Sequence, residues 1–143
     1  MIVFTAGQPK LADRIINSLD PSGKLFACRL YKSNCRVLPK RGIHLKDLRI
    51  LERDLRSVVI VDNNANSFGH QRANGVLISN FEGDKRDMEM LALKKYLDWL
   101  WMFEDVRIGN EAHFGFELRV KALEETRANN RKRRGLSSTS YKV

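Results

Sequence analysis

The stretch VVIVDNNANSF, residues 58–68, joins a run of apolar residues to a cluster of polar ones. Four branched apolar residues run directly into Asp62, Asn63 and Asn64. A continuous apolar run of this length, bounded by polar residues, is typical of a strand that is buried on both faces. The three polar side chains at its end therefore either cap the next element or form the floor of a site.

Short apolar runs alternate along the chain with segments in which apolar residues recur at helical spacing. Such alternation, with short connections, predicts an α/β fold in which helices cover a parallel sheet. Ligands bind outside the carboxyl ends of the strands in such sheets, so Thr5 and Asp62, which end two of the runs, are expected at one edge. The expected strands are 2–5, 25–31, 58–62 and 76–79, the expected helices are 9–20, 47–55, 84–103 and 111–128, and residues 32–42 are expected to form a loop or hairpin.

The composition is that of a globular protein. Of the 143 residues, 43% are hydrophobic and 30% are charged, which is ordinary for a folded domain. No apolar run approaches the roughly 20 residues that a membrane-spanning helix needs, and the opening MIVFTAG lacks the basic segment of a secretory signal. We expect Cys28 and Cys35 to be reduced thiols, because a lone pair at this spacing fits neither a disulfide framework nor a four-ligand zinc site.

The net charge of +9 is concentrated near the carboxyl end. Residues 127–143 hold six basic residues and no acidic one, which leaves +3 for the other 126 residues. This segment is rich in Ser and Thr and is expected to be disordered. Its RKRR run is a candidate nuclear address, polyanion contact or solubilising end. The near balance of charge elsewhere disfavours direct nucleic-acid binding, and the expected compartment is the nucleus or the cytoplasm.

Four side chains, taken in chain order, suggest a phosphate site. Thr5 ends the first strand, Lys46 precedes an expected helix in IHLKDL, and Asp62 and Asn63 end the buried strand. A hydroxyl and an ammonium bind phosphate oxygens, and a carboxylate with an amide oxygen suits Mg²⁺. The ordinary alternative is that Lys46 and its acidic neighbour only solvate and cap the start of a helix.

The segments VFTAG, IHLKDL and ERDLRSVVIVDNNANSF, in this order, resemble the haloacid-dehalogenase-type (HAD) phosphatases. More narrowly, they are similar to the FCP/SCP, or NLI-interacting-factor-like, branch over roughly residues 1–103. The resemblance implies a HAD-like, Rossmann-type parallel sheet with flanking helices. It also implies a Mg²⁺-dependent phosphatase for phosphoserine or phosphothreonine in proteins, such as the C-terminal tail of RNA polymerase II. We therefore expect a partial phosphatase domain at 1–105, a helical extension at 106–126 and the basic tail at 127–143.

The resemblance assigns a role to each of the four side chains. Thr5 matches the threonine that hydrogen-bonds the transferred phosphate. Lys46, expected at the mouth of the site, matches the lysine that stabilises the phosphate and the nucleophile. Asp62 and Asn63 match the pair whose oxygens serve the Mg²⁺ site directly or through water. His44, beside the KDL segment, is expected to be an ordinary loop or strand histidine.

One departure from the family concerns the nucleophile. The family's first motif is DxDx[TV], whose first Asp forms the aspartyl-phosphate, and residues 1–143 contain no DxD. Neither Thr5 nor Lys46 replaces it, because covalent phosphoryl transfer needs an attacking oxygen in line with the leaving group. We therefore expect an N-terminally truncated domain that is inactive alone. In the family's sheet the strand of that motif lies between the strands that end at Thr5 and Asp62. A fragment, a rearranged pairing and a strand donated by a partner chain are the three alternatives.

Two functions agree with these observations. The first is the protein phosphatase domain, with a phosphoprotein as its substrate or a protein as its partner. The second is a non-catalytic binding or scaffold protein on a degenerate HAD-like fold. It would resemble the family's branch that serves as a receptor subunit of the mitochondrial inner-membrane import machinery. That branch usually lacks the Asp-Asn pair, so Asp62 and Asn63 favour the phosphatase.

Overall fold

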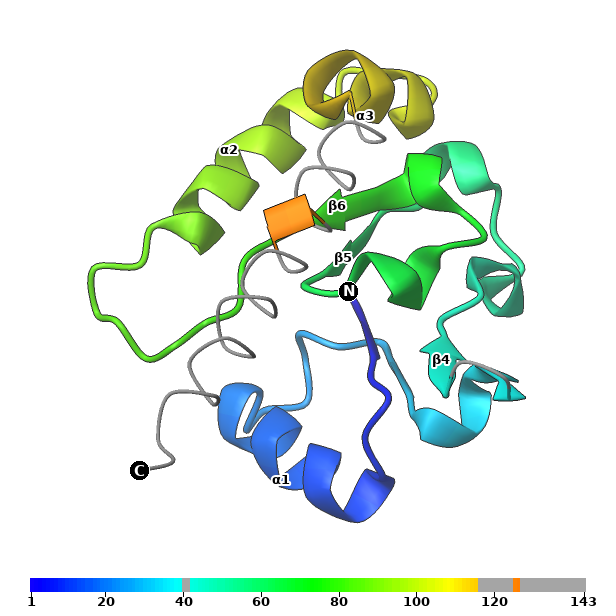
Figure 1. Cartoon of the computed structure of the whole chain (residues 1–143). Helices are drawn as coiled ribbons and strands as arrows, with labels where there is room; N and C mark the ends of the chain where they lie inside the picture. The colour runs from blue at the N-terminus through cyan, green and yellow to red at the C-terminus, as the bar shows by residue number, and fades with distance from the viewer. Residues whose placement is uncertain (40–41, 116–124, 127–143) are drawn as a thin grey trace, which may run out of the picture.

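The computed structural model describes residues 1–39, 42–115 and 125–126. Figure 1 shows α1 at one end of the molecule, α2 and α3 at the other, and strands between them. The strands are β1 (Ile2–Phe4), β2 (Cys28–Leu30), β3 (Arg36–Leu38), β4 (Ile43–Leu45), β5 (Ile60–Asp62) and β6 (Gly75–Leu77), and the α-helices are α1 (Pro9–Leu19), α2 (Glu89–Leu100) and α3 (Val106–Phe114). Short 3₁₀ turns connect them: η1 (Lys32–Asn34), η3 (Leu48–Leu51), η4 (Leu55–Ser57), η5 (Ala65–Phe68) and η6 (Arg72–Asn74). No helix of the described ranges is long and apolar enough to cross a membrane.

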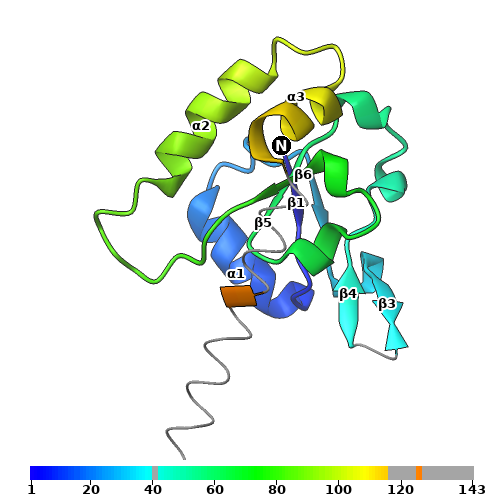
Figure 2. The same ribbon diagram turned by 45° about the horizontal axis from the view of Figure 1, so that its top comes forward.

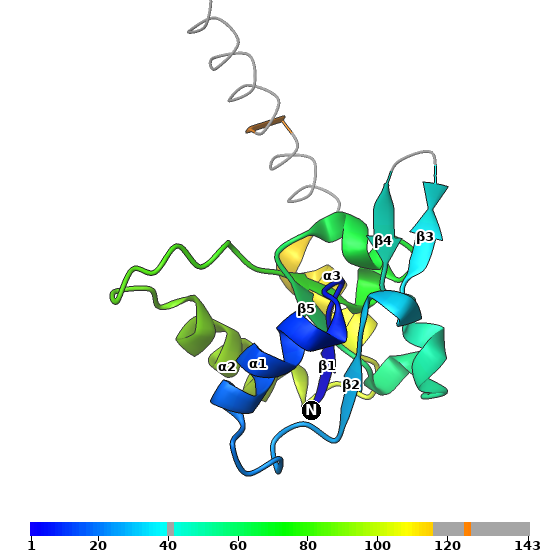
Figure 3. The same cartoon turned by 90° about the horizontal axis from the view of Figure 1, so that it is seen from below.

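The described strands pair two by two. β1 and β2 are parallel, with Val3 opposite Arg29, and lie side by side in Figure 3. β5 and β6 are also parallel, with Val61 opposite Val76. Among the described strands β1 bonds only to β2 and β5 only to β6, so both outer edges of each parallel pair lack a strand partner within the described ranges. The predicted parallel pairing is confirmed, whereas these strands do not join into one continuous sheet.

β3 and β4 pair as the two strands of a hairpin. β3 and β4 are antiparallel, with Val37 opposite His44, and Figure 2 shows them projecting from the body of the molecule. The sequence predicted a loop or hairpin for residues 32–42, and the structure has a hairpin whose second strand, β4, lies just after that range. β4 ends at Leu45, so the next residue, Lys46, lies beside the end of β5.

The β5–β6 pair carries core side chains on both of its faces. Successive residues of a strand point to opposite faces. Ile60 and Leu77 pack with the fully buried Phe68 on one face, whereas Val61 and Val76 pack on the other face, toward α2. The prediction of a strand buried on both faces is therefore confirmed for β5, although β5 begins at Ile60, two residues later than predicted.

A buried carboxylate sets the start of β2. Asp20 follows α1 and is 2% exposed. Its oxygens accept the backbone N–H groups of Lys24, Leu25 and Phe26 at 2.9–3.2 Å. Because these N–H groups are bonded to Asp20, they cannot join a strand ladder. β2 consequently begins at Cys28, three residues later than predicted.

The predicted helix over 47–55 is wrong in type. The segment forms the two 3₁₀ turns η3 and η4 instead of an α-helix. Asp47 and Asp54 each accept the backbone N–H of the residue two positions later, so each starts a new turn. The residue after η3 has a left-handed φ of 50°, which ends the first turn.

The last two helices differ from the prediction in their bounds. α2 begins at Glu89 rather than at residue 84, and Asp87 accepts the Glu89 N–H at 2.7 Å. α3 begins at Val106 and ends before Gly115, which has a left-handed φ of 42°. The predicted helix from residue 111 lies mostly outside the described residues, and the predicted basic tail lies entirely outside them.

Asn110 fixes α3 to the core. This residue is 1% exposed. Its amide group donates to the Ala73 carbonyl at 2.7 Å and accepts the Tyr96 hydroxyl. The first turns of α3 thus pack on the rest of the structure, while the predicted domain boundary at residue 105 stays a prediction.

Candidate functional site

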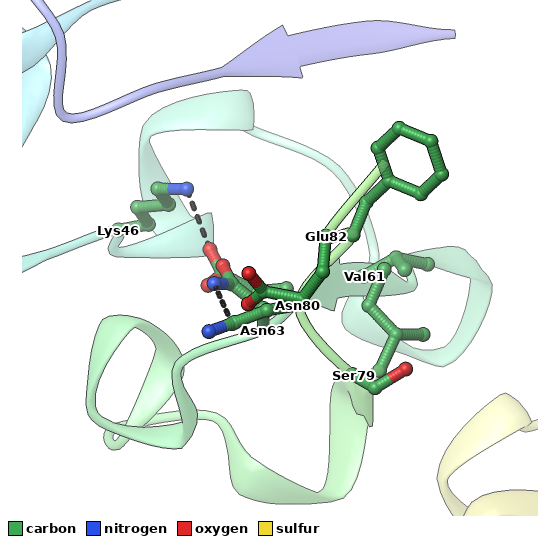
Figure 4. Close-up of a pocket in the computed structure, with 9 residues that line it drawn as sticks. Lys46, Val61, Asn63, Ser79, Asn80 and Glu82 are labelled. Atoms are coloured by element: carbon green, nitrogen blue, oxygen red, sulfur yellow. Dashed lines mark hydrogen bonds and ion pairs between the residues drawn. The ribbon is translucent and has the colours of Figure 1, made fainter. Parts of the chain in front are cut away.

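Lys46 and Asp62 meet at the carboxyl end of β5. The Lys46 backbone N–H donates to the Ser67 carbonyl at 2.6 Å, which holds the end of β4 beside the turn after β5. Its Nζ lies 2.5 Å from Asp62 Oδ2, as the dashed line at Lys46 in Figure 4 marks. The two side chains are only 13% and 5% exposed. Lys46 is therefore more deeply buried than we expected for a residue at the mouth of a site.

The three polar residues after VVIV have different surroundings. Asp62 Oδ1 accepts the Asn64 N–H at 2.8 Å, and Asn64 in turn caps η5 by accepting the Asn66 N–H at 3.1 Å. Asn63 is exposed, and its amide donates to Asn80 Oδ1 at 2.6 Å. Asn64 is therefore a cap, whereas Asp62 and Asn63 line a cavity, and their role as the floor of a site stays a prediction.

The cavity measures about 470 Å³ and lies at the carboxyl ends of β5 and β6. Part of its lining is charged or polar and part is apolar, and Figure 4 shows Lys46 on the opposite side from Val61. Its volume falls within the range of small-ligand pockets, roughly 300–1,000 Å³. The described residues that line it are Lys46, Val61, Asp62, Asn63, Ile78, Ser79, Asn80, Phe81 and Glu82.

Thr5 is not among the described residues that line this cavity. It directly follows β1, and its N–H donates to the Leu30 carbonyl at 2.9 Å. Its Oγ1 accepts the Gly7 N–H at 3.0 Å. The structure thus brings Lys46, Asp62 and Asn63 together, and it leaves Thr5 on the separate β1–β2 pair.

Cys35 lies near both Thr5 and the Lys46–Asp62 pair, a position that the sequence did not predict. Its Sγ contacts the Thr5 carbonyl at 3.9 Å. Burial raises the pKa of the Cys35 thiol, and the nearby charges of Lys46 and Asp62 act on it in opposite directions, Lys46 lowering the pKa and Asp62 raising it. A raised pKa keeps the thiol protonated and unreactive. The location of Cys35 near these residues follows only from the folded structure, because nothing in the sequence around Cys35 distinguishes it from an ordinary core cysteine.

Asp62 and Asn63 are of the right chemical kind for Mg²⁺, but two side chains are too few. Mg²⁺ takes six oxygen ligands at about 2.0–2.1 Å and usually keeps waters and phosphate oxygens among them. In the described ranges, no three His, Cys, Asp or Glu side chains converge on one point. Both Asp62 oxygens already accept hydrogen bonds. These two side chains therefore do not form a complete metal site.

Comparison with known proteins places the chain in a family. The NLI interacting factor-like phosphatases match residues 1–107. The chain belongs to this family. It is 43% identical over 107 residues to CTD small phosphatase-like protein 2 of Dictyostelium discoideum, covering 75% of this chain and 18% of that protein. It is 35% identical over 105 residues to the human CTD small phosphatase-like protein, covering 73% of this chain and 37% of that protein.

Another relative is a translocase subunit. The mitochondrial import inner membrane translocase subunit TIM50 of Kluyveromyces lactis is 33% identical over 134 residues, which covers 87% of this chain and 27% of that protein. The chain thus spans well under half the length of these relatives. One name states a mitochondrial import translocase and the other two state phosphatase-like proteins, so membership of the family does not by itself fix the compartment or the task of this chain.

Proposed function

We propose that residues 1–143 carry the phosphate-binding side of a Mg²⁺-dependent phosphoserine/phosphothreonine phosphatase domain of the CTD-phosphatase type, on a HAD-like fold. The observation that carries this proposal is the Lys46–Asp62 ion pair beside Asn63 at the carboxyl end of a parallel strand pair. Ligands of α/β proteins bind at this end of the strands. Membership of the family suggests the class of reaction.

The charges and donors suit a phosphate monoester. In this proposal Lys46 is shared between Asp62 and the phosphate, so that its positive charge balances the negative charge of the substrate. Thr5 Oγ1 already accepts the Gly7 N–H, so its hydroxyl hydrogen is the part that donates toward a phosphate oxygen. Asp62 and Asn63 would hold Mg²⁺ together with phosphate oxygens, waters and ligands from outside these residues. When bound, the metal would neutralise charge on the phosphoryl group.

The attacking carboxylate comes from elsewhere in this proposal. In this proposal Asp62 is not the nucleophile, because its Oδ2 pairs with Lys46, its Oδ1 accepts the Asn64 N–H, and its remaining lone pairs serve Mg²⁺. We therefore propose that the chain alone does not turn over a phosphoprotein. An extended segment from outside residues 1–143 would supply the carboxylate, on a strand placed between β1 and β5. The edges of β1 and β5 that have no partner among the described strands support this placement.

A non-catalytic protein-binding role is the second candidate. The similarity to the translocase subunit favours it, because that alignment covers 87% of the chain. It ranks second because Lys46, Asp62 and Asn63 form a connected polar group beside a cavity, which a purely structural scaffold does not need.

Two measurements on the purified, ¹⁵N-labelled chain test the proposal. Inorganic phosphate, titrated with and without Mg²⁺, is expected to shift the NMR signals of Lys46 and Asn63. The variant Asn63→Ala should lose the Mg²⁺-dependent part of the shift. Lys94→Met, which alters an exposed ion pair outside the cavity, should retain it.

A phosphoserine peptide supplied to the same chain is expected to release no phosphate. Failure of phosphate to perturb Lys46 and Asn63 would contradict the phosphate-binding role and favour the scaffold. Phosphate release by the chain alone would contradict the proposal that it lacks the attacking group.

A further inference from the structure

The cavity extends past the ion pair onto a wall that the proposed phosphate chemistry does not use. Residues 79–82 follow β6 and line the cavity. Asn80 accepts the Asn63 amide at 2.6 Å, and the Ser79 N–H donates to Glu89 Oε1 at 3.2 Å. One bond ties this wall to the end of β5 and the other ties it to the start of α2, so the wall has a defined position beside the site (Figure 4).

Phe81 provides most of the exposed apolar surface of this wall. It is 73% exposed, and it is the only aromatic residue among the described residues that line the cavity. The half-buried Val61 and Ile78 add apolar area to the same lining. A single exposed apolar residue is ordinary on a protein surface. Here, however, it shares one open cavity with a buried ammonium–carboxylate pair, so the cavity suits a ligand with a charged group and an adjacent apolar group.

We propose that Phe81 is a specificity-determining residue that packs against an apolar side chain next to the phosphorylated residue of a peptide. This inference rests on the proposed function, because it assumes that the phosphate lies at Lys46. A peptide anchored there must lay its neighbouring residues along the remaining lining of the cavity. An apolar neighbour would remove water from Phe81, whereas glycine would leave the ring exposed.

Glu82 narrows the class of peptide further. It lines the same wall, and its side chain is exposed. A carboxylate at this place repels an acidic or second phosphorylated residue of the peptide and thereby selects against it. The expected ligand is therefore a singly phosphorylated peptide that is apolar beside the phosphoserine.

Binding of two peptides to the full chain tests this inference without requiring turnover. Each peptide holds one phosphoserine in a glycine-rich sequence, and one of them has leucine on both sides of the phosphoserine. NMR titration is expected to give a dissociation constant roughly fivefold lower for the leucine peptide, and Phe81→Ala should abolish that difference. The matched control is Trp101→Ala, because Trp101 is 88% exposed and does not line the cavity.

Inorganic phosphate, titrated in parallel, separates the two proposals. If phosphate and both peptides bind equally well to the chain and to the Phe81→Ala variant, the role of Phe81 is overturned and the proposed function stands. If neither phosphate nor either peptide perturbs the site, both proposals are overturned. Glu82→Gln should raise the affinity for a leucine peptide with an added aspartate, and an unchanged affinity would overturn the role of Glu82.

Discussion

Lys46 Nζ and Asp62 Oδ2 lie 2.5 Å apart in a pair that solvent barely reaches. The pair joins the end of β4 to the end of β5, so it stabilises the fold as well as forming part of the candidate site. Removal of one partner from a buried ion pair leaves the other charge uncompensated, which typically costs about 3–5 kcal/mol.

Lys46→Met and Asp62→Asn are each expected to lower the free energy of unfolding by about 3–5 kcal/mol, and the double variant should lose less than the sum. Urea denaturation, followed by tryptophan fluorescence, measures these losses. In the control Lys94→Met, the exposed pair with Asp98 should be worth no more than about 0.5 kcal/mol. A loss below about 1 kcal/mol for both single variants would show that the pair is not buried as described.

Gly75 is expected to tolerate no side chain. A Cβ atom at this position would lie 2.0 Å from Cε2 of the fully buried Phe68. Gly75→Ala should therefore destabilise the protein by at least about 1–3 kcal/mol. Gly69→Ala is the control, because its Cβ would meet nothing closer than 3.6 Å and its φ of −57° suits alanine. Equal unfolding midpoints in urea for the two variants would contradict the packing of β6 against Phe68.

Asn74 joins β6 to the segment that leads into β5. Its amide donates to the carbonyls of Leu55 and Val58 at 2.6 and 2.7 Å, and the residue is 2% exposed. Asn74→Ala leaves both carbonyls without this donor and is expected to cost about 2–4 kcal/mol in unfolding free energy. Asn66→Ala, which alters an exposed side chain, should cost far less. Similar costs for the two variants, measured by urea denaturation, would argue against a structural role for Asn74.

Stability at alkaline pH should depend on Tyr96. Burial raises the pKa of its phenol to about 12, above the usual value of about 10. Because the folded-state pKa is the higher one, this contribution to stability is complete below about pH 10 and is lost as the pH rises toward 12. Tyr96→Phe should show a smaller loss of unfolding free energy between about pH 9 and pH 11.5. Tyr31, whose pKa is also raised, is retained in both proteins and cancels in the comparison. Parallel pH profiles would contradict the burial of the Tyr96 hydroxyl.

Sequence periodicity predicted the positions of several elements because the spacing of apolar residues follows the period of a helix or strand. The strand that ends at Asp62 and the helix that begins at Pro9 are examples, although Leu11, Ile15 and Leu19 of that helix are exposed. The helix over 47–55 was wrong because leucines at helical spacing also suit two short turns, and Asp47 and Asp54 compete for the backbone N–H groups. The late start of β2 follows from Asp20, whose burial is a property of the tertiary structure.

The candidate-site residues were predictable where a chemically suitable side chain also stands at the end of an expected element. Lys46, Asp62 and Asn63 were identified from their residue types and their places in the chain, and the structure places them on one cavity. The depth of the Lys46–Asp62 pair was not predictable, because it depends on how β4 docks beside β5. The exposure of Phe81 on the cavity was not predictable, since an aromatic residue after a strand is usually part of the core.

Release of phosphate from a phosphoserine peptide in the presence of Mg²⁺ tests most directly whether residues 1–143 supply everything except the attacking group. One protein is the chain itself. The second carries at its amino end an apolar strand that ends in Asp-x-Asp-x-Thr, joined by a flexible linker of about 15 residues, since a parallel strand needs a long crossover. The third differs from the second only in having asparagine for the first of those aspartates.

We predict release by the second protein alone. Release by the unextended chain would contradict the proposal, because residues 1–143 would then supply the attacking group themselves.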